Sequence, residues 1–168
     1  MTPELFVQKY LPFALETQKK TGISAVAILA QAALESAWGD AAPGNMFFGV
    51  KDIDGINGNE QLITTTEYHS TMGVKYPVVL KIEPVVRNGR KMFKYTVKDY
   101  FRRFDTPEGS FTHHANMFLN SRIYKKAMLV KHDPVAFVKA VAAAGYATDP
   151  DYSRVMVNMV ASIQRRIK

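Results

Sequence analysis

The sequence predicts a mainly α-helical α+β domain in which a β-hairpin is inserted after the second helix. Apolar residues recur at helical spacing in residues 2–38 and again from residue 108 onward. Between these segments, residues 61–97 are rich in β-branched side chains and roughly alternate in polarity, which is typical of strands. Because the chain has 168 residues and no low-complexity run, residues 1–168 are predicted to form a single domain.

Two helices are predicted in the N-terminal part. Thr2 suits the N-cap of the first, because Pro3 follows at the first helical position and Gly22 ends the apolar pattern. The second is predicted to begin after Ser24 as N-cap and to run through Trp38. Its many alanines allow the backbone of a neighbouring helix to approach closely.

The central segment predicts strands joined by a tight turn. Residues 62–68 are β-branched and alternating, and residues 77–86 form a second β-rich stretch. The pair Asn88-Gly89 is favoured in a type I′ turn, and the strand pattern returns at residues 92–97. A hairpin at this turn is therefore expected.

Helices are predicted again in the last third of the chain. Asp133 and Pro134 mark the start of one of them, and Gly145 marks its end. The predicted helical ranges are 108–119, 124–130, 135–144 and 151–166.

The composition bounds the possible functions. Hydrophobic residues make up 47% of the chain and charged residues 22%, as in ordinary globular proteins. No apolar run approaches the ~20 residues that span a bilayer, and no signal peptide is visible, so we expect an excised domain or another export route. The net charge of +7 favours anionic partners such as nucleic acid or the cell wall.

Several classes of partner and cofactor are not expected. The absence of cysteine rules out disulfides and thiolate metal sites, and the four histidines lack the spacing of metal ligands. Lys and Arg are scattered along the chain and no nucleic-acid-binding motif is present. We therefore expect no metal, no cofactor and no nucleic acid partner, and we expect a monomer.

Four segments carry the pattern that is most informative about function. Residues 30–39 read AQAALESAWG, and residues 45–51 read NMFFGVK. Residues 101–111 contain FRRF and EGSF, and residues 144–150 read AGYATDP. In this order they resemble the signature of the bacterial peptidoglycan glucosaminidases, glycoside hydrolase family 73, which includes the flagellar muralytic domain. The resemblance implies a lysozyme-like fold with the hairpin over an active-site cleft.

Glu35 is the candidate general acid. It lies near the end of a small-residue, apolar helix, where loss of hydration disfavours the charged carboxylate and raises its pKa. A raised pKa suits an acid that protonates a glycosidic oxygen near neutral pH. The family's motif marks the same position; the alternative is a glutamate on the solvated stripe of an amphipathic helix.

A second carboxylate would stabilise the positive sugar or activate water. Glu67 is the candidate, because the family's hairpin resembles T-x-E here and a strand folded over the cleft would bring it opposite Glu35. The alternative is a solvent-facing glutamate on an exposed strand edge. The alternative candidates for the second carboxylate lie in the loop before this strand and are Asp52, Asp54 and Glu60.

Five further residues are candidates for substrate binding. In the family, the tyrosine that Tyr146 matches lines the cleft and orients the sugar; the alternative is a core tyrosine. The Asn45 amide suits an N-acetyl group. Phe47 and Phe48 are expected beside Glu35, although an extended segment would place one of them in the core. Tyr68 completes the set.

Three other features of the sequence bear on these expectations. Trp38 is expected to pack in the core. The loop at residues 54–58 lacks a tryptophan that many family members carry, which puts one sugar subsite in doubt. Residues 76–95 are long for the family and predict an enlarged hairpin with altered substrate selection.

Together these features predict a peptidoglycan hydrolase that cleaves the β-1,4 bond after N-acetylglucosamine. The alternatives are a muramidase or lytic transglycosylase that cuts the N-acetylmuramic acid linkage, and a non-catalytic wall-binding domain. The mechanism stays open between inversion and participation of the substrate's N-acetyl group. The enzyme would act in the periplasm or the extracellular wall, in flagellar assembly, wall remodelling, phage lysis or as a bacteriolytic effector.

Overall fold

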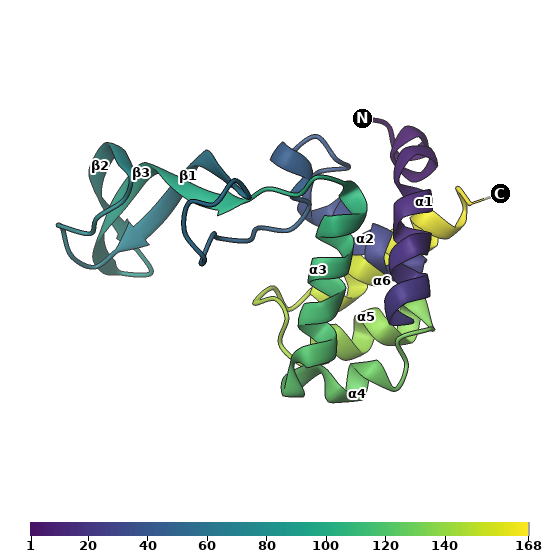
Figure 1. The fold of residues 1–168 in the computed structure, drawn as a ribbon. Coiled ribbons are helices and arrows are strands. Elements are labelled where there is room, and N and C mark those ends of the chain that lie inside the picture. The colour runs from purple at the N-terminus through teal and green to yellow at the C-terminus, as the bar shows by residue number, and fades with distance from the viewer. Residues whose placement is uncertain (168) are drawn as a thin grey trace. The chain divides into compact units, whose positions relative to one another are not determined.

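The computed structural model describes residues 1–167, whose helices and strands are labelled in Figure 1. They divide into two compact units. The helical unit comprises Met1–Phe48 together with the chain from Phe104 onward, and the strand unit comprises Gly49–Arg103. The architecture is α+β and mainly helical, as predicted.

The helical unit contains all the α-helices of the described chain. The predicted helices are confirmed, with ends that differ by a few residues from the predicted ones. Their bounds are α1 Pro3–Thr21, α2 Ala25–Glu35, α3 Pro107–Asn120, α4 Lys125–Met128, α5 Pro134–Ala143 and α6 Tyr152–Gln164, with 3₁₀ turns η1 Pro43–Asn45 and η2 Arg122–Tyr124.

Helix α2 lies at the centre of this unit. It packs against α1, α5 and α6, and it is buried on almost every side, since Ala25 and residues 27–33 are all buried. A helix that is apolar all round is found inside a protein, and the alanines here let neighbouring backbones approach. The N-cap prediction is confirmed, because Oγ of Ser24 accepts the amide hydrogen of Ala27 at 3.4 Å.

The predicted end of α2 at Trp38 is wrong, because the helix ends at Glu35. The hydroxyl of Ser36 donates to the Ala32 carbonyl at 2.5 Å and accepts the amide hydrogen of Gly39 at 2.9 Å, which closes the chain into a turn. Within that turn Trp38 has a positive φ of 56°. Glu35 is therefore the last residue of a buried helix, at the point where the chain turns.

Aromatic rings fill the space between α1, α2 and α3. Phe47 packs edge-on against Tyr10 at 4.9 Å between ring centroids, and its ring is tilted against that of Phe111 at 5.0 Å. Trp38 packs edge-on against Phe6 at 5.5 Å. The core position predicted for Trp38 is confirmed in part, since its ring contacts the core but stays partly exposed.

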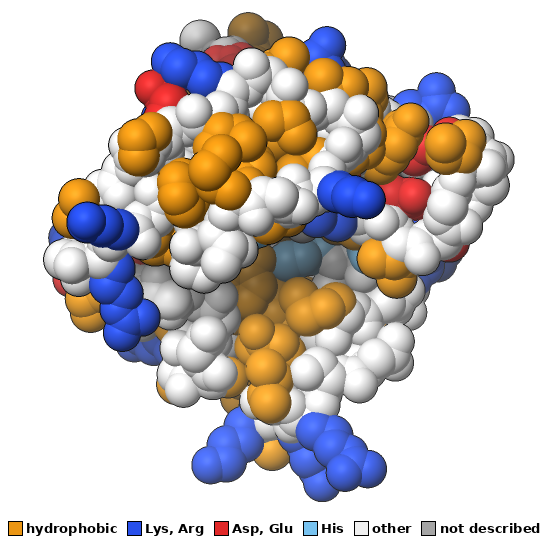
Figure 2. All heavy atoms as spheres, turned by 90° about the vertical axis from the view of Figure 1, so that its left-hand side faces the viewer, with side chains coloured by type: hydrophobic (Ala, Val, Ile, Leu, Met, Phe, Trp, Pro, Cys, Tyr) orange, Lys and Arg blue, Asp and Glu red, His pale blue; other side chains and the backbone are white. Residues whose placement is uncertain are grey.

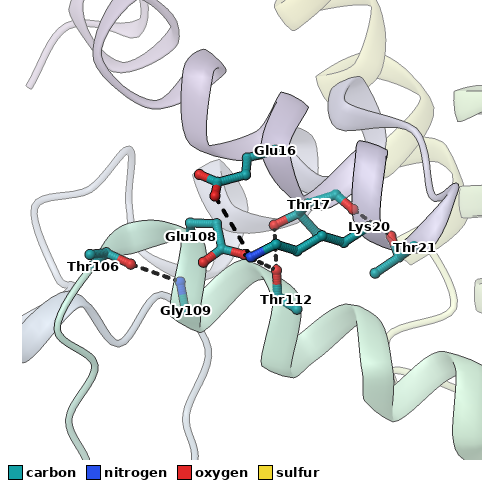
Figure 3. Close-up of polar contacts among 8 residues, drawn as sticks. All are labelled: Glu16, Thr17, Lys20, Thr21, Thr106, Glu108, Gly109 and Thr112. Atoms are coloured by element: carbon teal, nitrogen blue, oxygen red, sulfur yellow. Dashed lines mark hydrogen bonds and ion pairs between the residues drawn. The ribbon is translucent and has the colours of Figure 1, made fainter.

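Polar contacts join α1 to α3 (Figure 3). Lys20 donates to Glu108 at 2.7 Å, and Thr112 donates to the same carboxylate oxygen at 2.6 Å. The hydroxyls of Thr17 and Thr112 share a hydrogen bond of 2.8 Å, and Thr106 caps the start of α3. The glutamate of the EGSF segment thus holds two helices together.

The strand unit is a three-stranded antiparallel sheet. Its strands are β1 Glu60–His69, β2 Val78–Arg87 and β3 Arg90–Arg102, in the order β1-β3-β2. The predicted hairpin is confirmed between β2 and β3, where Asn88 and Gly89 have φ of 51° and 74°, as a type I′ turn requires. The insertion is larger than a hairpin, because β1 pairs with β3 along its whole length.

The two faces of the sheet differ in exposure. Directly opposed residues point to the same side, and successive residues along a strand point to opposite sides. Tyr95, Val97 and Phe101 are buried on one side, which we call the covered face. On the other side, which we call the open face, none of the side chains of β3 is buried.

Candidate functional site

Glu35 lies at the surface end of α2, with its carboxylate held by a tyrosine from the far end of the chain. The hydroxyl of Tyr146 donates to Oε1 of Glu35 at 2.5 Å. The protein packed against one side of Glu35 removes water from the carboxyl group and raises its pKa, while the hydrogen bond from Tyr146 acts in the opposite direction. The result is a solvent-accessible carboxyl group that holds a proton to higher pH than an ordinary glutamate.

Tyr146 sits in the loop that follows α5. Gly145, just before it, has a φ of 86°, a left-handed conformation that favours glycine and turns the chain out of the helix. The Tyr146 ring lies 5.6 Å from Phe118 and 5.5 Å from Tyr152, measured between ring centroids. These contacts fix the ring, so that its hydroxyl is aimed at Glu35.

His114 lies next to Tyr146. Its ring stacks on Phe48 at 3.6 Å between centroids, and its Nε2 lies 3.4 Å from the Tyr146 hydroxyl. Burial, with a smaller contribution from the charge of His113, lowers the pKa of His114 to about 3. His114 is therefore neutral at physiological pH. Of the two residues, Glu35 is the one that can carry a charge in this site.

Two residues near Glu35 were missed in the sequence. Gln31 precedes Glu35 by one helical turn and is 1% exposed, and Tyr152 is buried at the start of α6. Within residues 1–167, Nε2 of Gln31 and the hydroxyl of Tyr152 have no hydrogen-bond partner. Burial raises the pKa of Tyr152 to about 12. The i, i+4 spacing of Gln31 and Glu35 was the available signal for Gln31.

Phe47 and Phe48 do not line a surface in this structure. They are 2% and 3% exposed, and both rings belong to the aromatic core. The expectation that these rings contact sugar is therefore corrected to a packing role. A sequence stretch of two phenylalanines before a glycine gives no indication that a bend in the chain buries both.

Asn45 occupies a bend rather than an extended segment. Its φ is 57°, and its side-chain amide donates to the carbonyl of Phe104 at 3.0 Å. This hydrogen bond fastens the loop after α2 to the start of the segment that leads into α3. One of the two N–H donors of the amide is thus engaged within the protein.

Glu67 lies on β1, an edge strand of the sheet, and points to the covered face opposite Tyr95. Its Oε1 accepts from Lys51 at 2.9 Å, and the same ammonium binds Asp99 at 3.0 Å. The hydrogen bond that Lys51 donates to Glu67 is the largest of the effects that raise the pKa of Lys51. Glu67 is therefore half-buried and paired, rather than a free glutamate in solvent.

Tyr68 points to the open face, away from Glu67. The register places Tyr68 opposite Lys94, and the guanidinium carbon of Arg87 lies 3.8 Å from the centre of its ring. Because adjacent strand residues point to opposite faces, one sugar bound at Glu67 would not also contact Tyr68. Tyr68 remains a candidate for sugar binding on the open face alone.

The alternative carboxylates, Asp52, Asp54 and Glu60, form hydrogen bonds in the loop that leads into β1. Glu60 accepts the amide hydrogens of Asn57 and Gly58, each at 2.9 Å, and these bonds lower the pKa of Glu60. Asp54 hydrogen-bonds to Asp52, which raises the pKa of Asp52 and lowers that of Asp54. These three side chains stabilise the loop conformation.

The surface of the protein is basic. The net charge is +7, and Figure 2 shows Lys and Arg side chains spread over the side that it views, with fewer Asp and Glu. Across the described residues, no group of three or more His, Asp or Glu is arranged to hold a metal ion. Among the helices of residues 1–167, none is long and apolar enough to cross a membrane.

Comparison with known proteins finds one family model that matches nearly the whole chain. The model, described as mannosyl-glycoprotein endo-beta-N-acetylglucosaminidase, matches residues 11–165. The chain is 25% identical over 169 residues to the peptidoglycan hydrolase FlgJ of Vibrio parahaemolyticus, covering 97% of this chain and 48% of that protein. It is 33% identical over 135 residues to the exo-glucosaminidase LytG of Bacillus subtilis, covering 74% of this chain and 39% of that protein.

The fold also matches a solved structure. A C-terminally truncated glycoside hydrolase domain of FlgJ from Salmonella typhimurium superposes with a TM-score of 0.70 and 26% identity, covering 98% of this chain and 99% of that one. The chain spans less than half the length of the full-length relatives described above, 48% and 39%.

Proposed function

Since this chain belongs to the glucosaminidase family, we propose that it hydrolyses peptidoglycan at the β-1,4 bond after N-acetylglucosamine. The named activities of the relatives support this substrate, because both a peptidoglycan hydrolase and an exo-glucosaminidase are similar to the chain over most of its length. The described family model supports the N-acetylglucosamine linkage. We further propose that residues 1–168 act as one monomeric catalytic domain, in the periplasm or the extracellular wall.

The hydrogen bond between Glu35 and Tyr146 is the observation that carries the proposal. Breaking a glycosidic bond requires an acid that protonates the leaving oxygen. Glu35 has a raised pKa and reaches solvent, so it holds its proton to higher pH than an ordinary glutamate while staying accessible to substrate. Tyr146 holds Oε1, which fixes the plane of the carboxyl group and orients its second oxygen for proton transfer.

Glu67 is the proposed second carboxylate. In this role it would stabilise the positive charge that develops on the sugar or take a proton from the attacking water. Its contact with Lys51 supports the proposal, because this ion pair fixes the side chain on the covered face. Tyr146 is proposed to contact the sugar next to Glu35, and the loop containing Asn45 is proposed to shape the wall of the site.

Digestion of purified peptidoglycan tests the proposal. Wild type, Glu35→Gln and Glu67→Gln are incubated with sacculi, and the borohydride-reduced fragments are analysed by mass spectrometry. We expect reduced glucosamine ends from wild type and a rate about 10²–10⁴-fold lower for Glu35→Gln, which is the usual contribution of a general acid. Glu16→Gln is the matched control, because Glu16 is exposed on α1.

Other products would contradict the proposed linkage or reaction. Reduced muramic acid ends would identify a muramidase. Anhydro ends, together with full activity of Glu67→Gln, would identify a lytic transglycosylase, which needs no second carboxylate. A folded wild-type protein that yields no fragments would leave a wall-binding domain.

A further inference from the structure

The open face of the sheet carries a concentration of basic side chains. The register aligns Arg87 with Arg90, Glu83 with Lys94, and Val78 with Lys98. Together with Lys81 and Arg102, six basic side chains of the three strands lie on this face, against the carboxylates of Glu83 and Glu60. We call the part formed by Lys81, Arg87, Arg90, Lys94 and Lys98 the basic patch.

The covered face has a different charge pattern. There Lys51 is neutralised by Glu67 and Asp99, as described above. On the open face, Glu83 pairs with Lys81 at 2.9 Å and also attracts Lys94. One carboxylate thus serves two cations within the basic patch, so the patch keeps an excess of positive charge.

Two arginines of the basic patch repel one another, so their arrangement does not stabilise the fold. Arg87 and Arg90 are directly opposed at the end of the hairpin, where like charges destabilise a cross-strand pair. Arg87 is nonetheless held in place, because its guanidinium stacks on the ring of Tyr68 at 3.8 Å from the centroid. A held guanidinium loses less conformational entropy when it binds an anion.

We propose that the basic patch docks the carboxylate-bearing peptide stems of peptidoglycan. This inference rests on the proposed function, because it assigns a second contact with the same polymer. Guanidinium groups bind carboxylates through two parallel hydrogen bonds, and Lys94 and Lys98 add point charges along the same face. The patch therefore raises the affinity for cross-linked wall without touching the bond that is cleaved.

The spacing of the basic side chains suits a polymer. Arg90, Lys94 and Lys98 recur every fourth residue along β3, which places successive charges roughly 13 Å apart. Several weak contacts to one polymer act together, because each bound stem raises the effective concentration of the next. The enlarged hairpin expected from the sequence supplies the length of strand that this row of charges needs.

Binding to sacculi tests the inference separately from hydrolysis. All proteins carry Glu35→Gln, and the sacculi are stripped of covalently attached phosphate polymers. The patch variant combines Arg90→Gln, Lys94→Gln and Lys98→Gln. The matched control removes the same charge from exposed lysines of the helical unit, and combines Lys19→Gln, Lys125→Gln and Lys139→Gln.

We expect the patch variant to bind stripped sacculi roughly tenfold more weakly than the parent, with a smaller dependence on salt, whereas the control binds within about twofold. A charge-conserving variant, Lys94→Arg with Lys98→Arg, should bind like the parent. Circular dichroism and thermal melting check that each variant is folded. An equal loss of sacculus binding in the patch variant and in the control would overturn the inference. Unchanged binding of both variants would overturn it as well.

The source of the anion is tested with a second ligand. Sacculi whose free carboxyl groups have been converted to amides should bind the parent as weakly as untreated sacculi bind the patch variant. Unchanged binding to amidated sacculi would overturn the assignment to carboxylates. Tighter patch-dependent binding to duplex DNA or to phosphatidylglycerol vesicles would overturn it in favour of phosphate groups.

The proposed function and the docking inference fail in different ways. With Glu35 intact, the patch variant should cleave short, peptide-free glycan strands at the wild-type rate. A wild-type protein that cleaves these strands, but whose patch substitutions leave sacculus binding unchanged, retains the function and loses the docking site. A protein that binds through the patch but releases no fragments retains the docking site and loses the function.

Discussion

Tyr146 and Glu35 lie 111 positions apart in the chain and are joined by a hydrogen bond of 2.5 Å. The two groups influence one another in opposite senses. Lost hydration raises the pKa of Glu35, and the hydrogen bond from Tyr146 partly opposes this rise. Burial, with a smaller contribution from the charge of Glu35, keeps the pKa of Tyr146 far above its usual range. Tyr146 is therefore a hydrogen-bond donor, and Glu35 is the group that changes its protonation state.

Replacing Tyr146 by Phe should move the pH dependence of activity upward. Without the donated hydrogen bond the carboxylate form of Glu35 is less stable, so the pKa of Glu35 rises further. Because the protonated acid is the active form, the basic limb of a plot of kcat/KM against pH shifts to higher pH. We also expect kcat at the optimum to fall about tenfold or more, since the carboxyl group loses its orientation.

Tyr124→Phe is the matched control, because the Tyr124 ring contacts that of Tyr146 at 6.4 Å and Tyr124 makes no hydrogen bond with Glu35. Its basic limb should stay at the wild-type pH. A limb that moves to lower pH in Tyr146→Phe would contradict the assignment of Glu35 as the acid.

Glu35→Gln should make the protein more stable at neutral pH. The folded state raises the pKa of Glu35, so the folded protein binds this proton more tightly than the unfolded chain does. This contribution to stability is present below the ordinary pKa of glutamate and is lost as the pH rises through the raised value. Gln carries no charge, so the variant avoids the loss.

The measurement is thermal unfolding of both proteins at pH 4 and pH 7.5. We expect the Tm of Glu35→Gln to exceed that of wild type by more at pH 7.5 than at pH 4. An equal difference at both values would mean that the carboxylate of Glu35 is well hydrated in the folded protein.

Local sequence signals predicted most of the fold. The N-cap at Ser24, the Asn88-Gly89 turn and the start of a helix at Pro134 all lie where the chain indicated, because each depends on a few adjacent residues. The end of α2 was misplaced because AWG continues an apolar pattern, whereas the hydroxyl of Ser36 closes the helix early.

The site was only partly predictable for the same reason. Glu35 and Tyr146 were both singled out from motifs, and the structure brings them into contact. Phe47 and Phe48 were expected beside Glu35 because the pattern does not reveal a bend. The opposite faces of Glu67 and Tyr68 follow from the register of three strands, which was unknown. Burial and register depend on distant segments, which one sequence does not encode locally.

His114 should make the protein sensitive to acid. Its ring is neutral in the folded protein, where burial lowers the pKa to about 3, whereas the unfolded chain binds a proton near pH 6.5. Above pH 6.5 both states are neutral and His114 has no effect. Below it the unfolded state gains the proton first, so the free energy of unfolding falls by about 1.4 kcal/mol per pH unit down to about pH 3.

His114→Phe removes this titration and keeps an aromatic ring between Phe48 and Phe118. Urea unfolding from pH 7 to pH 4 should show a shallower loss of stability for this variant than for wild type. His132→Gln, at an exposed position, should follow the wild-type curve. Parallel curves for all three proteins would contradict a neutral, buried His114.

Glu108 should contribute to stability through the contacts that join α3 to α1. Its carboxylate accepts from Lys20 and from Thr112, and these bonds lower the pKa of Glu108. The side chain is only 14% exposed, so Glu108→Gln should reduce the free energy of unfolding by about 1 kcal/mol, or a Tm loss of roughly 2–4 °C.

The loss depends on pH in a direction opposite to that of Glu35. A lowered pKa means that Glu108 stabilises the fold above the ordinary pKa of glutamate and that this contribution is lost as the pH falls through the lowered value. The Tm difference between wild type and Glu108→Gln should therefore be large at pH 7 and small at pH 3. Glu16→Gln is the control, because Glu16 lies 3.7 Å from the same lysine at an exposed position and should change the Tm little at either pH. A loss in Glu108→Gln that is equal at both pH values would assign the contribution of Glu108 to packing rather than to its charge.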